Sequence, residues 1–538
     1  MKALFARRGA MLAALCLGIC SAGAGAQEPD TGASSLPAPF LALQPMAQTQ
    51  KAVFADGAHG ELLDVNESVG RWYLLSVQEA DGVRRIAHLD AGAENASKLT
   101  IAAQGLSVER NGQSRICPLG NKGDRDLVFS DAGRPFGLVP ACGVWIRGSA
   151  TGSKSTLEAA TDLLRSTGSA GEAIINLQKN LFAHSGDSAE SAEGPVARSS
   201  TQGPPAPTFA SAPEAIAAPN LSIAVPGGNN AVKPGAWMPA ADAPNVWVSV
   251  ASPNLAGGAD SALVYLMAID LNAFHGHYAV GVDHPMLNWS DRAPGPHTGP
   301  GPDGFSQIMP LRREGMVPPW EQAGVGMVFA GGFKREHSAF KRGPRAAANH
   351  GSHYGFVEAG VVLSPLQPGL ATLWQRLGEP VKMGPWSAEE QKRGVDGLIF
   401  ARQNGLPLVT GGQLGSDLSA FSATGNWSGN HEGKPETMRS AVCLIGQGKA
   451  QFLAYAVFSS AEPQEMGKLL KAYGCQEAMQ LDMNAPELTY GALIVRDEKG
   501  APKAEPLLSS MGRGPSGGRF VNTPDTRDFF YWSRGPRR

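Results

Sequence analysis

The sequence predicts a protein of α+β or mixed α/β class, in which a carboxyl-terminal mixed-sheet domain follows a small, mostly β domain. Three observations lead to this prediction. Residues 439–490 change their apolar period in the order strand, strand, helix, strand. Residues 51–148 contain short apolar runs divided by Gly, Asn and Asp, which is typical of strands joined by turns. Residues 185–243 contain few large apolar side chains and separate the two regions.

The first 26 of the 538 residues are expected to be a removable export signal. They combine a basic head, an apolar core and a small-residue cleavage site, namely Lys2, Arg7 and Arg8, then Met11–Ile19, then Ala24-Gly25-Ala26. We therefore expect a bacterial protein that is periplasmic or secreted.

A formal net charge of −2 gives no basic excess of the nucleic-acid-binding kind. No later run is apolar enough to predict a membrane span.

Four cysteines follow the expected signal, and they form two pairs in the sequence. Cys117 and Cys142 lie in one half of the chain, and Cys443 and Cys475 lie in the other. In an oxidising compartment this distribution predicts the disulfides Cys117–Cys142 and Cys443–Cys475. A metal site made of these cysteines would need close Cys-x-x-Cys spacings, which the sequence does not contain.

Residues 46–184 are expected to form the small disulfide-linked β domain with trailing helices, and residues 185–243 a disordered linker. The expected strands are Trp72–Val77, Arg85–Leu89, Lys98–Ala103, Asp126–Ser130 and Val144–Arg147, and helical patterns follow at Ser155–Arg165 and Ala170–Phe182.

Residues 245–498 are expected to form the second domain. Ser440–Ile445 and Gln451–Phe458 are apolar runs separated by glycine-containing turn chemistry, which predicts a hairpin. A helix is expected from Pro463 to the C-capping Gly474, because apolar side chains recur at helical spacing between them. The strand expected at Ala478–Leu481 then leads to Asp482, at the end where α/β sheets place ligand-binding groups.

Residues 499–538 are expected to form a basic, aromatic tail, since residues 501–538 contain seven basic and three acidic residues. The charge is compatible with attachment to an acidic polymer or a membrane surface. The adjacent aromatic residues Phe529–Trp532 favour a final strand that docks on the second domain.

Residues 245–495 resemble the phosphodiester glycosidase family, the domain type of N-acetylglucosamine-1-phosphodiester α-N-acetylglucosaminidase. The resemblance is carried by short motifs, namely Ala330-Gly331-Gly332-Phe333-Lys334 after a strand, Gly369–Leu373, Arg402-Gln403-Asn404, the Arg439-Ser440 strand start and Leu481-Asp482. Two motifs depart from the family pattern. Ala330 stands where the family has Asn, and Met483-Asn484-Ala485-Pro486 replaces a glycine run.

This resemblance implies a hydrolase that cleaves a sugar phosphodiester, or a related envelope glycan, at the glycosidic bond without a cofactor. A carbohydrate or sugar-phosphate is the expected partner. Asp482 is the candidate catalytic carboxylate, Arg439 the candidate phosphate clamp and Glu358 a candidate second carboxylate. The candidate substrate-binding residues are Gly331, Gly332, Lys334 and Asn484. A structural role is open for three of these: Asp482 can cap a turn, the glycine pair can form a tight turn, and Arg439 can be a solvated strand end.

Two other functions fit the sequence. The chain can be a non-catalytic glycan-binding or envelope-structural protein on the same fold. It can also be a metal-dependent hydrolase that binds zinc through histidines, the candidates being His275, His277, His284, His350 and His353. No acidic ligand stands at a convincing spacing from these histidines, so we expect no metal site. The sequence leaves the sugar, the stereochemical outcome and the oligomeric state open.

Overall fold

The computed structural model describes residues 49–92, 97–130, 135–148, 223–224, 231–232, 237–240, 245–251, 264–284, 312–334, 355–416, 418, 437–446, 451–512 and 518–535. These residues belong to one compact unit, residues 37–538. The expected export signal, the helices expected at 155–165 and 170–182 and most of the expected linker lie outside the described residues.

The amino-terminal region contains two antiparallel sheets. The first has the strand order β1 (Gln50–Val53), β2 (His59–Asp64), β3 (Trp72–Gln78), β4 (Arg84–Asp90), β9 (Val144–Arg147), β8 (Phe136–Val139). The second has the order β5 (Lys98–Ala102), β6 (Gly105–Arg110), β7 (Gln113–Pro118). Both contribute to one hydrophobic core, which includes Leu75 and Leu89 of the first sheet and Leu99 and Val108 of the second.

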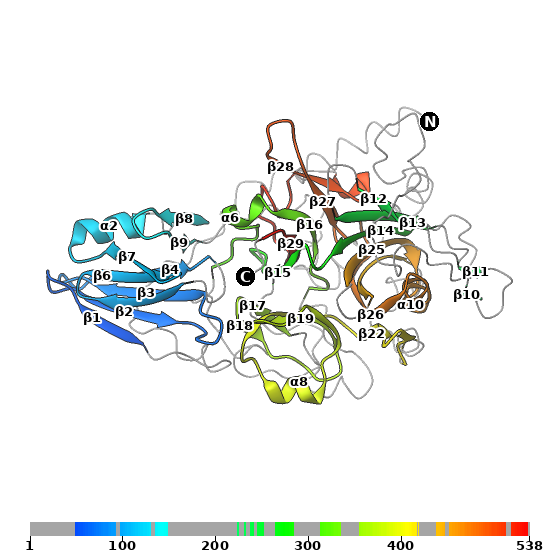
Figure 1. Ribbon diagram of the computed structural model, residues 1–538, viewed down its shortest axis with the longest axis horizontal. Helices are drawn as coiled ribbons and strands as arrows, with labels where there is room; N and C mark the ends of the chain where they lie inside the picture. The colour runs from blue at the N-terminus through cyan, green and yellow to red at the C-terminus, as the bar shows by residue number, and fades with distance from the viewer. Residues whose placement is uncertain are drawn as a thin grey trace, which may run out of the picture. The chain divides into compact units, whose positions relative to one another are not determined.

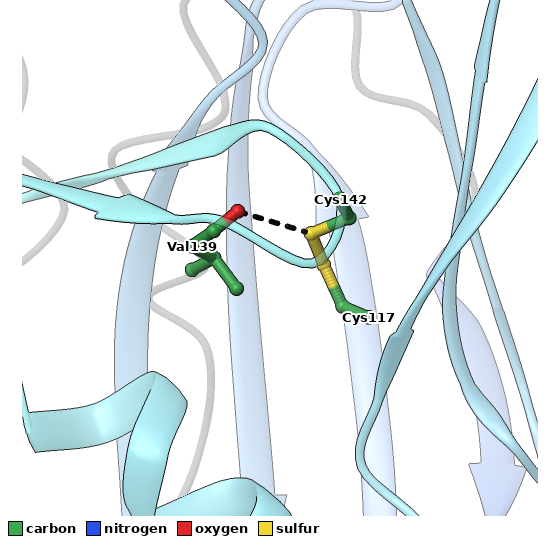
Figure 2. Close-up of a disulfide and its surroundings, with 3 residues drawn as sticks. All are labelled: Cys117, Val139 and Cys142. Atoms are coloured by element: carbon green, nitrogen blue, oxygen red, sulfur yellow. Dashed lines mark hydrogen bonds between the residues drawn. A yellow bond between two sulfur atoms is a disulfide. The ribbon is translucent and has the colours of Figure 1, made fainter.

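The predicted disulfide Cys117–Cys142 links these two sheets. Cys117 lies on β7, and Cys142 lies in the turn between β8 and β9 (Figure 2). The sulfur of Cys142 lies 3.9 Å from the carbonyl oxygen of Val139. Because a disulfide sulfur carries no proton, this is a packing contact, and the covalent bond is what joins the sheets.

The strand expected at Asp126–Ser130 is wrong, because these residues belong to helix α2 (Lys122–Ser130). Asn121 Oδ1 accepts a hydrogen bond from the Asp124 N–H at 3.0 Å, which caps the first turn. The buried Arg125 donates from this helix to Glu79 and Asp56. A helix-cap residue and long-range ion pairs therefore outweigh the local β propensity of the apolar residues.

An eight-stranded sheet forms the largest part of the carboxyl-terminal region (Figure 1). Its strand order is β12 (Met238–Pro239), β13 (Val246–Ala251), β14 (Val264–Asp270), β25 (Phe452–Ala461), β24 (Thr437–Ile445), β26 (Cys475–Met483), β22 (Pro407–Thr410), β23 (Gln413–Leu414). Helix α10 (Pro463–Ala472) follows β25, and Gly474 has the left-handed φ of 83° expected of a C-cap. The predicted strand pair, helix and returning strand are therefore present, and Cys443–Cys475 forms the second predicted disulfide.

Two five-stranded sheets complete the region. One has the order β15 (His275–Ala279), β29 (Phe529–Ser533), β16 (Val325–Ala330), β27 (Gly491–Arg496), β28 (Pro502–Pro506). The other has the order β18 (Val361–Ser364), β17 (Phe356–Glu358), β21 (Leu398–Gln403), β19 (Ala371–Arg376), β20 (Lys382–Pro385). The other elements in the described residues are the strands β10 (Ile223–Ala224) and β11 (Ala231–Val232), the helices α6 (Pro319–Gln322) and α8 (Ala388–Arg393), and the 3₁₀ turn η4 (Ser509–Gly512).

The prediction of an α+β or mixed α/β class is wrong, because the described part of the chain is mostly β. The ladders between its named strands are antiparallel. Helix α10 carries the chain from β25 across β24 to β26, and both strands pair with β24 in antiparallel register. The prediction took the local strand-helix-strand pattern of β25, α10 and β26 as typical of the whole domain. The rest of the described domain consists mainly of antiparallel strands.

The aromatic run near the chain end forms β29, a fully buried strand between β15 and β16 (Figure 1). This agrees with the interpretation of the tail as a docking strand.

Within the described residues, no helix is both long and apolar enough to cross a membrane.

Candidate functional site

Several strand ends meet around a turn formed by residues 331–333, which we call the Gly-Gly corner. β16 ends at Ala330, and Ala330 pairs with Phe529, the first residue of β29. Asp528 therefore lies beside the corner, and its carbonyl oxygen accepts the Gly331 N–H at 2.8 Å. Asn404, just after β21, accepts the Phe333 N–H through Oδ1 at 3.2 Å. Asn404 also donates through Nδ2 to the Gln480 carbonyl on β26.

Both glycines of the corner are required by close packing. A Cβ atom at Gly331 would collide with the carboxylate of Asp528. A Cβ atom at Gly332 would lie 2.9 Å from the side-chain amide of Asn404, and Gly332 has a φ of 131°. The structural interpretation of the two glycines therefore holds. The Gly331 N–H is bound to Asp528, whereas the Gly332 N–H has no hydrogen bond within the described part of the chain.

Asp528 is the centre of a buried hydrogen-bonded network. Its Oδ2 accepts from the Tyr278 hydroxyl at 2.9 Å and from Arg402 Nε at 2.8 Å. Its Oδ1 lies 2.6 Å from His284 Nδ1, which must carry the proton because a carboxylate only accepts. Arg402 also donates to the carbonyl of Phe333 at 2.8 Å. The network therefore contacts the Gly-Gly corner at two residues, at Gly331 through the Asp528 carbonyl and at Phe333 through Arg402.

The charges of this network follow from burial and from its close partners. Burial alone would raise the pKa of Asp528, but the charge of Arg402 and the hydrogen bonds from His284 and Arg402 hold that pKa well below its ordinary value. Burial lowers the pKa of His284 to about 4, so the imidazole is neutral at pH 7. Burial, and then the charge of Asp528, raise the pKa of Tyr278 well above its ordinary value. The network therefore contains one anion, one cation and two neutral donors.

Asp482 is connected to the Gly-Gly corner through Arg527. Asp482 is the penultimate residue of β26 and is only 5% exposed. Its Oδ2 pairs with the guanidinium of Arg527, and its Oδ1 accepts the Met483 N–H at 2.8 Å. Arg527 donates in turn to the Gly332 carbonyl at 3.2 Å. The structure therefore brings together Asp482 and the two glycines singled out in the sequence.

The other candidates have different surroundings. Arg439 is fully buried and donates to the carbonyl of Ala461 at 2.7 Å and to the sulfur of Met483 at 3.3 Å. Asn484 forms part of the turn after β26, where its N–H donates to the Met438 carbonyl at 2.8 Å. Lys334 follows the Gly-Gly corner directly and is buried.

Glu358 lines a small cavity together with Tyr278, Arg147 and Glu314, and Asp482 does not line this cavity. Its Oε2 accepts the Val280 N–H at 3.2 Å. Arg147 forms a two-pronged ion pair with Glu314, at 2.6 and 2.8 Å. Burial raises the pKa of Glu358 to about 8 against the opposing charge of Arg147, so the carboxyl is protonated at pH 7. Tyr278 contacts both this cavity and Asp528, because it lines the cavity and its hydroxyl donates to Asp528.

The candidate zinc-binding histidines have different partners where they are described. His277 Nε2 lies 3.0 Å from the Ser533 hydroxyl, and its ring stacks on Tyr531. His284 binds Asp528 instead. His350 and His353 lie outside the described residues. Within the described residues, no group of three or more His, Cys, Asp or Glu side chains is arranged to hold a metal ion.

Sequence reasoning missed Arg527, Asp528 and Tyr278, and it considered His284 only as a metal ligand. One available signal is the charged pair Arg527-Asp528 directly ahead of the aromatic run Phe529–Trp532. It also missed Gln480, which is 1% exposed and whose Oε1 accepts no hydrogen bond within the described part of the chain. A buried acceptor without a donor is costly.

Comparison with known proteins gives weak structural similarity. No family model and no curated protein sequence matches the chain. The catalytic domain of zebrafish N-acetylglucosamine-1-phosphodiester α-N-acetylglucosaminidase, auto-inhibited by its pro-peptide, matches with a TM-score of 0.32 and 11% identity over 55% of this chain and 86% of that one. A hypothetical protein from Synechocystis matches with a TM-score of 0.29 and 8% identity over 92% and 84%. A putative exported protein from Burkholderia pseudomallei matches with a TM-score of 0.22 and 11% identity over 52% and 76%. Similarity at this level carries no functional conclusion.

Proposed function

We propose that the protein is an exported hydrolase that cleaves a sugar phosphodiester, or a related envelope glycan, at the glycosidic bond. The observation that carries the proposal is the Asp482 carboxylate, which is joined to the Gly-Gly corner through Arg527. The two disulfides support the extracytoplasmic location, because such bonds persist in oxidising compartments.

Cleavage of this glycosidic bond depends more on a carboxylate near the anomeric carbon than on a general acid that protonates the leaving group. A phosphate leaving group is a weak base, so its departure needs little protonation, whereas positive charge develops at the anomeric carbon. In the proposal Asp482 stabilises or attacks that centre. In the same proposal the phosphate is bound by the Gly332 N–H and by Lys334, which is two residues further along the chain. Arg439 remains a candidate phosphate clamp, Asn484 and Gln480 are candidate partners for sugar hydroxyls, and we assign no step to Glu358.

A non-catalytic glycan-binding role is the second candidate, and one observation favours it. Asp482 is 5% exposed, and both of its carboxylate oxygens have protein partners. A carboxylate held in this way can be a structural ion pair that stabilises the turn after β26.

Hydrolysis of a panel of aryl sugar-1-phosphodiesters tests the proposal. We expect the wild-type chain to release the aryl phosphate from one or more members, and we expect Asp482→Asn to abolish release. Glu389→Gln is the matched control, because Glu389 is an exposed carboxylate on α8 and its loss should leave the rate unchanged. If the wild type bound a glycan but hydrolysed no member of the panel, the proposed hydrolase would be refuted and the non-catalytic glycan-binding role supported.

A further inference from the structure

The last strand of the chain brings two charged residues to the Gly-Gly corner. Arg527 and Asp528 stand directly ahead of β29, which is inserted between β15 and β16. Because Phe529 pairs with Ala330, these residues lie beside the residues that follow Ala330. Arg527 and Gly332 are in contact although 195 positions separate them in the sequence.

The Arg527 guanidinium contacts both parts of the proposed site. One of its nitrogens donates to the Gly332 carbonyl and also pairs with the Asp482 carboxylate. The side chain is 2% exposed, so water does not weaken these interactions as it does at a surface. The two N–H bonds of one guanidinium nitrogen lie in the plane of the group at a fixed angle, so this single nitrogen can hold two acceptors in a set orientation.

The backbone that carries Arg527 is also fixed. The Arg527 N–H donates to Asp525 Oδ1 at 2.8 Å. The Asp525 carboxylate forms a two-pronged ion pair with Arg519, at 2.7 and 3.1 Å, and Arg519 donates further to the Glu487 carbonyl. Asp528, the next residue, is fixed by Arg402, Tyr278 and His284. The guanidinium therefore stands on a backbone that is restrained on both sides.

We propose that Arg527 is the positioning residue of the site, which sets the distance and orientation of the Asp482 carboxylate relative to the Gly-Gly corner. The kinetic consequence of this inference rests on the proposed function, whereas its structural consequence does not. Arg527 touches no reacting atom in this scheme. It acts through Asp482.

Hydrogen–deuterium exchange of the full chain tests the structural part. Arg527→Lys keeps the positive charge but loses the planar set of donors, so exchange of the amides of residues 331–334 should increase. Arg376→Lys is the matched control, because Arg376 is likewise 2% exposed and pairs with Glu390 at 3.0 Å, on a different sheet. The control should leave exchange at the Gly-Gly corner unchanged. Equal exchange at residues 331–334 in Arg527→Lys and the wild type would overturn the inference.

Steady-state kinetics test the functional part. Because misplacing a catalytic group by about 1 Å can cost roughly 100-fold in rate, we expect Arg527→Lys to lower kcat by about 10-fold to 100-fold with KM changed much less. In Arg527→Ala, added guanidinium ion should restore part of kcat, which a loss of overall folding would prevent. An unchanged kcat in Arg527→Lys would refute the positioning role. If the wild type hydrolyses no substrate of the panel, the proposed function fails, and the exchange result still decides the role of Arg527.

Discussion

Glu358 should make the stability of the protein depend on pH, and Glu358→Gln should remove that dependence. The carboxyl is 7% exposed, and its pKa is raised from 4.5 to about 8, first by burial. Glutamine has nearly the same shape and can still accept the Val280 N–H, but it does not titrate. The substitution therefore isolates the cost of ionising this one group.

The sign and size follow from linkage. Between pH 4.5 and about 8 the carboxyl is protonated in the folded chain and ionised in the unfolded chain, so folding takes up a proton. The contribution of Glu358 to stability is complete below pH 4.5 and is lost as pH rises to about 8. Each pH unit in this range lowers the free energy of unfolding by about 1.4 kcal/mol, up to a total of about 5 kcal/mol. The charges of Arg147, Glu314 and Arg71 contribute to the shifted pKa of Glu358, so their interaction with its carboxylate is already included in this difference.

Chemical denaturation at pH 5, 6, 7, 8 and 9, with the disulfides kept oxidised, measures this difference. We expect the wild type and Glu358→Gln to have similar unfolding free energies near pH 5. The variant should become progressively more stable than the wild type up to pH 8. The exposed control Glu389→Gln should follow the wild type throughout. A constant difference between the wild type and Glu358→Gln across this range would refute the assignment of a protonated Glu358.

Two further substitutions test the packing of the site and of its sheet. Gly332→Ala should destabilise the chain by about 2 to 5 kcal/mol, because it adds the strain of a positive φ to a collision with Asn404. Gly378 is the control, because its φ is also positive but no atom lies within 4 Å of the added Cβ. Gly378→Ala should therefore lower the free energy of unfolding by only about 1 to 2 kcal/mol in the same denaturation assay. Equal costs would show that the corner is not closely packed. Replacing Cys443 and Cys475 together by serine should lower the free energy of unfolding by about 3 to 4 kcal/mol, because the bond closes a loop with a sequence separation of 32. Unchanged thermal unfolding of this double variant would contradict that expectation.

Prediction from the sequence succeeded for a helix or strand whose signals lie within its own residues. The helix expected from Pro463 to Gly474 is α10, and its apolar stripe Met466, Leu469 and Leu470 is fully buried. The 3.6-residue period and the terminal glycine are local properties of the chain. The strand expected at Asp126–Ser130 failed because the residues that stabilise α2, such as Glu79, lie far away in the sequence.

The candidate site was predictable in part for the same reason. The Gly331-Gly332 turn follows a strand and Asp482 lies at the end of one, both strands are visible in the apolar pattern, and the family resemblance directed attention to these residues. Arg527 could not be connected to either, because the connection requires β29 to insert between β15 and β16. An apolar strand presents the same local pattern whichever strands it pairs with.

The sequence by itself determined the short elements, the two cysteine pairs and the glycine corner, since each depends on residues that are near one another or on a simple count. Only the tertiary structure decided the antiparallel, mostly β architecture and the residues that surround Asp482. Strand pairing is made by backbone groups that all residues share, so the choice of partner comes from the packing of the whole chain.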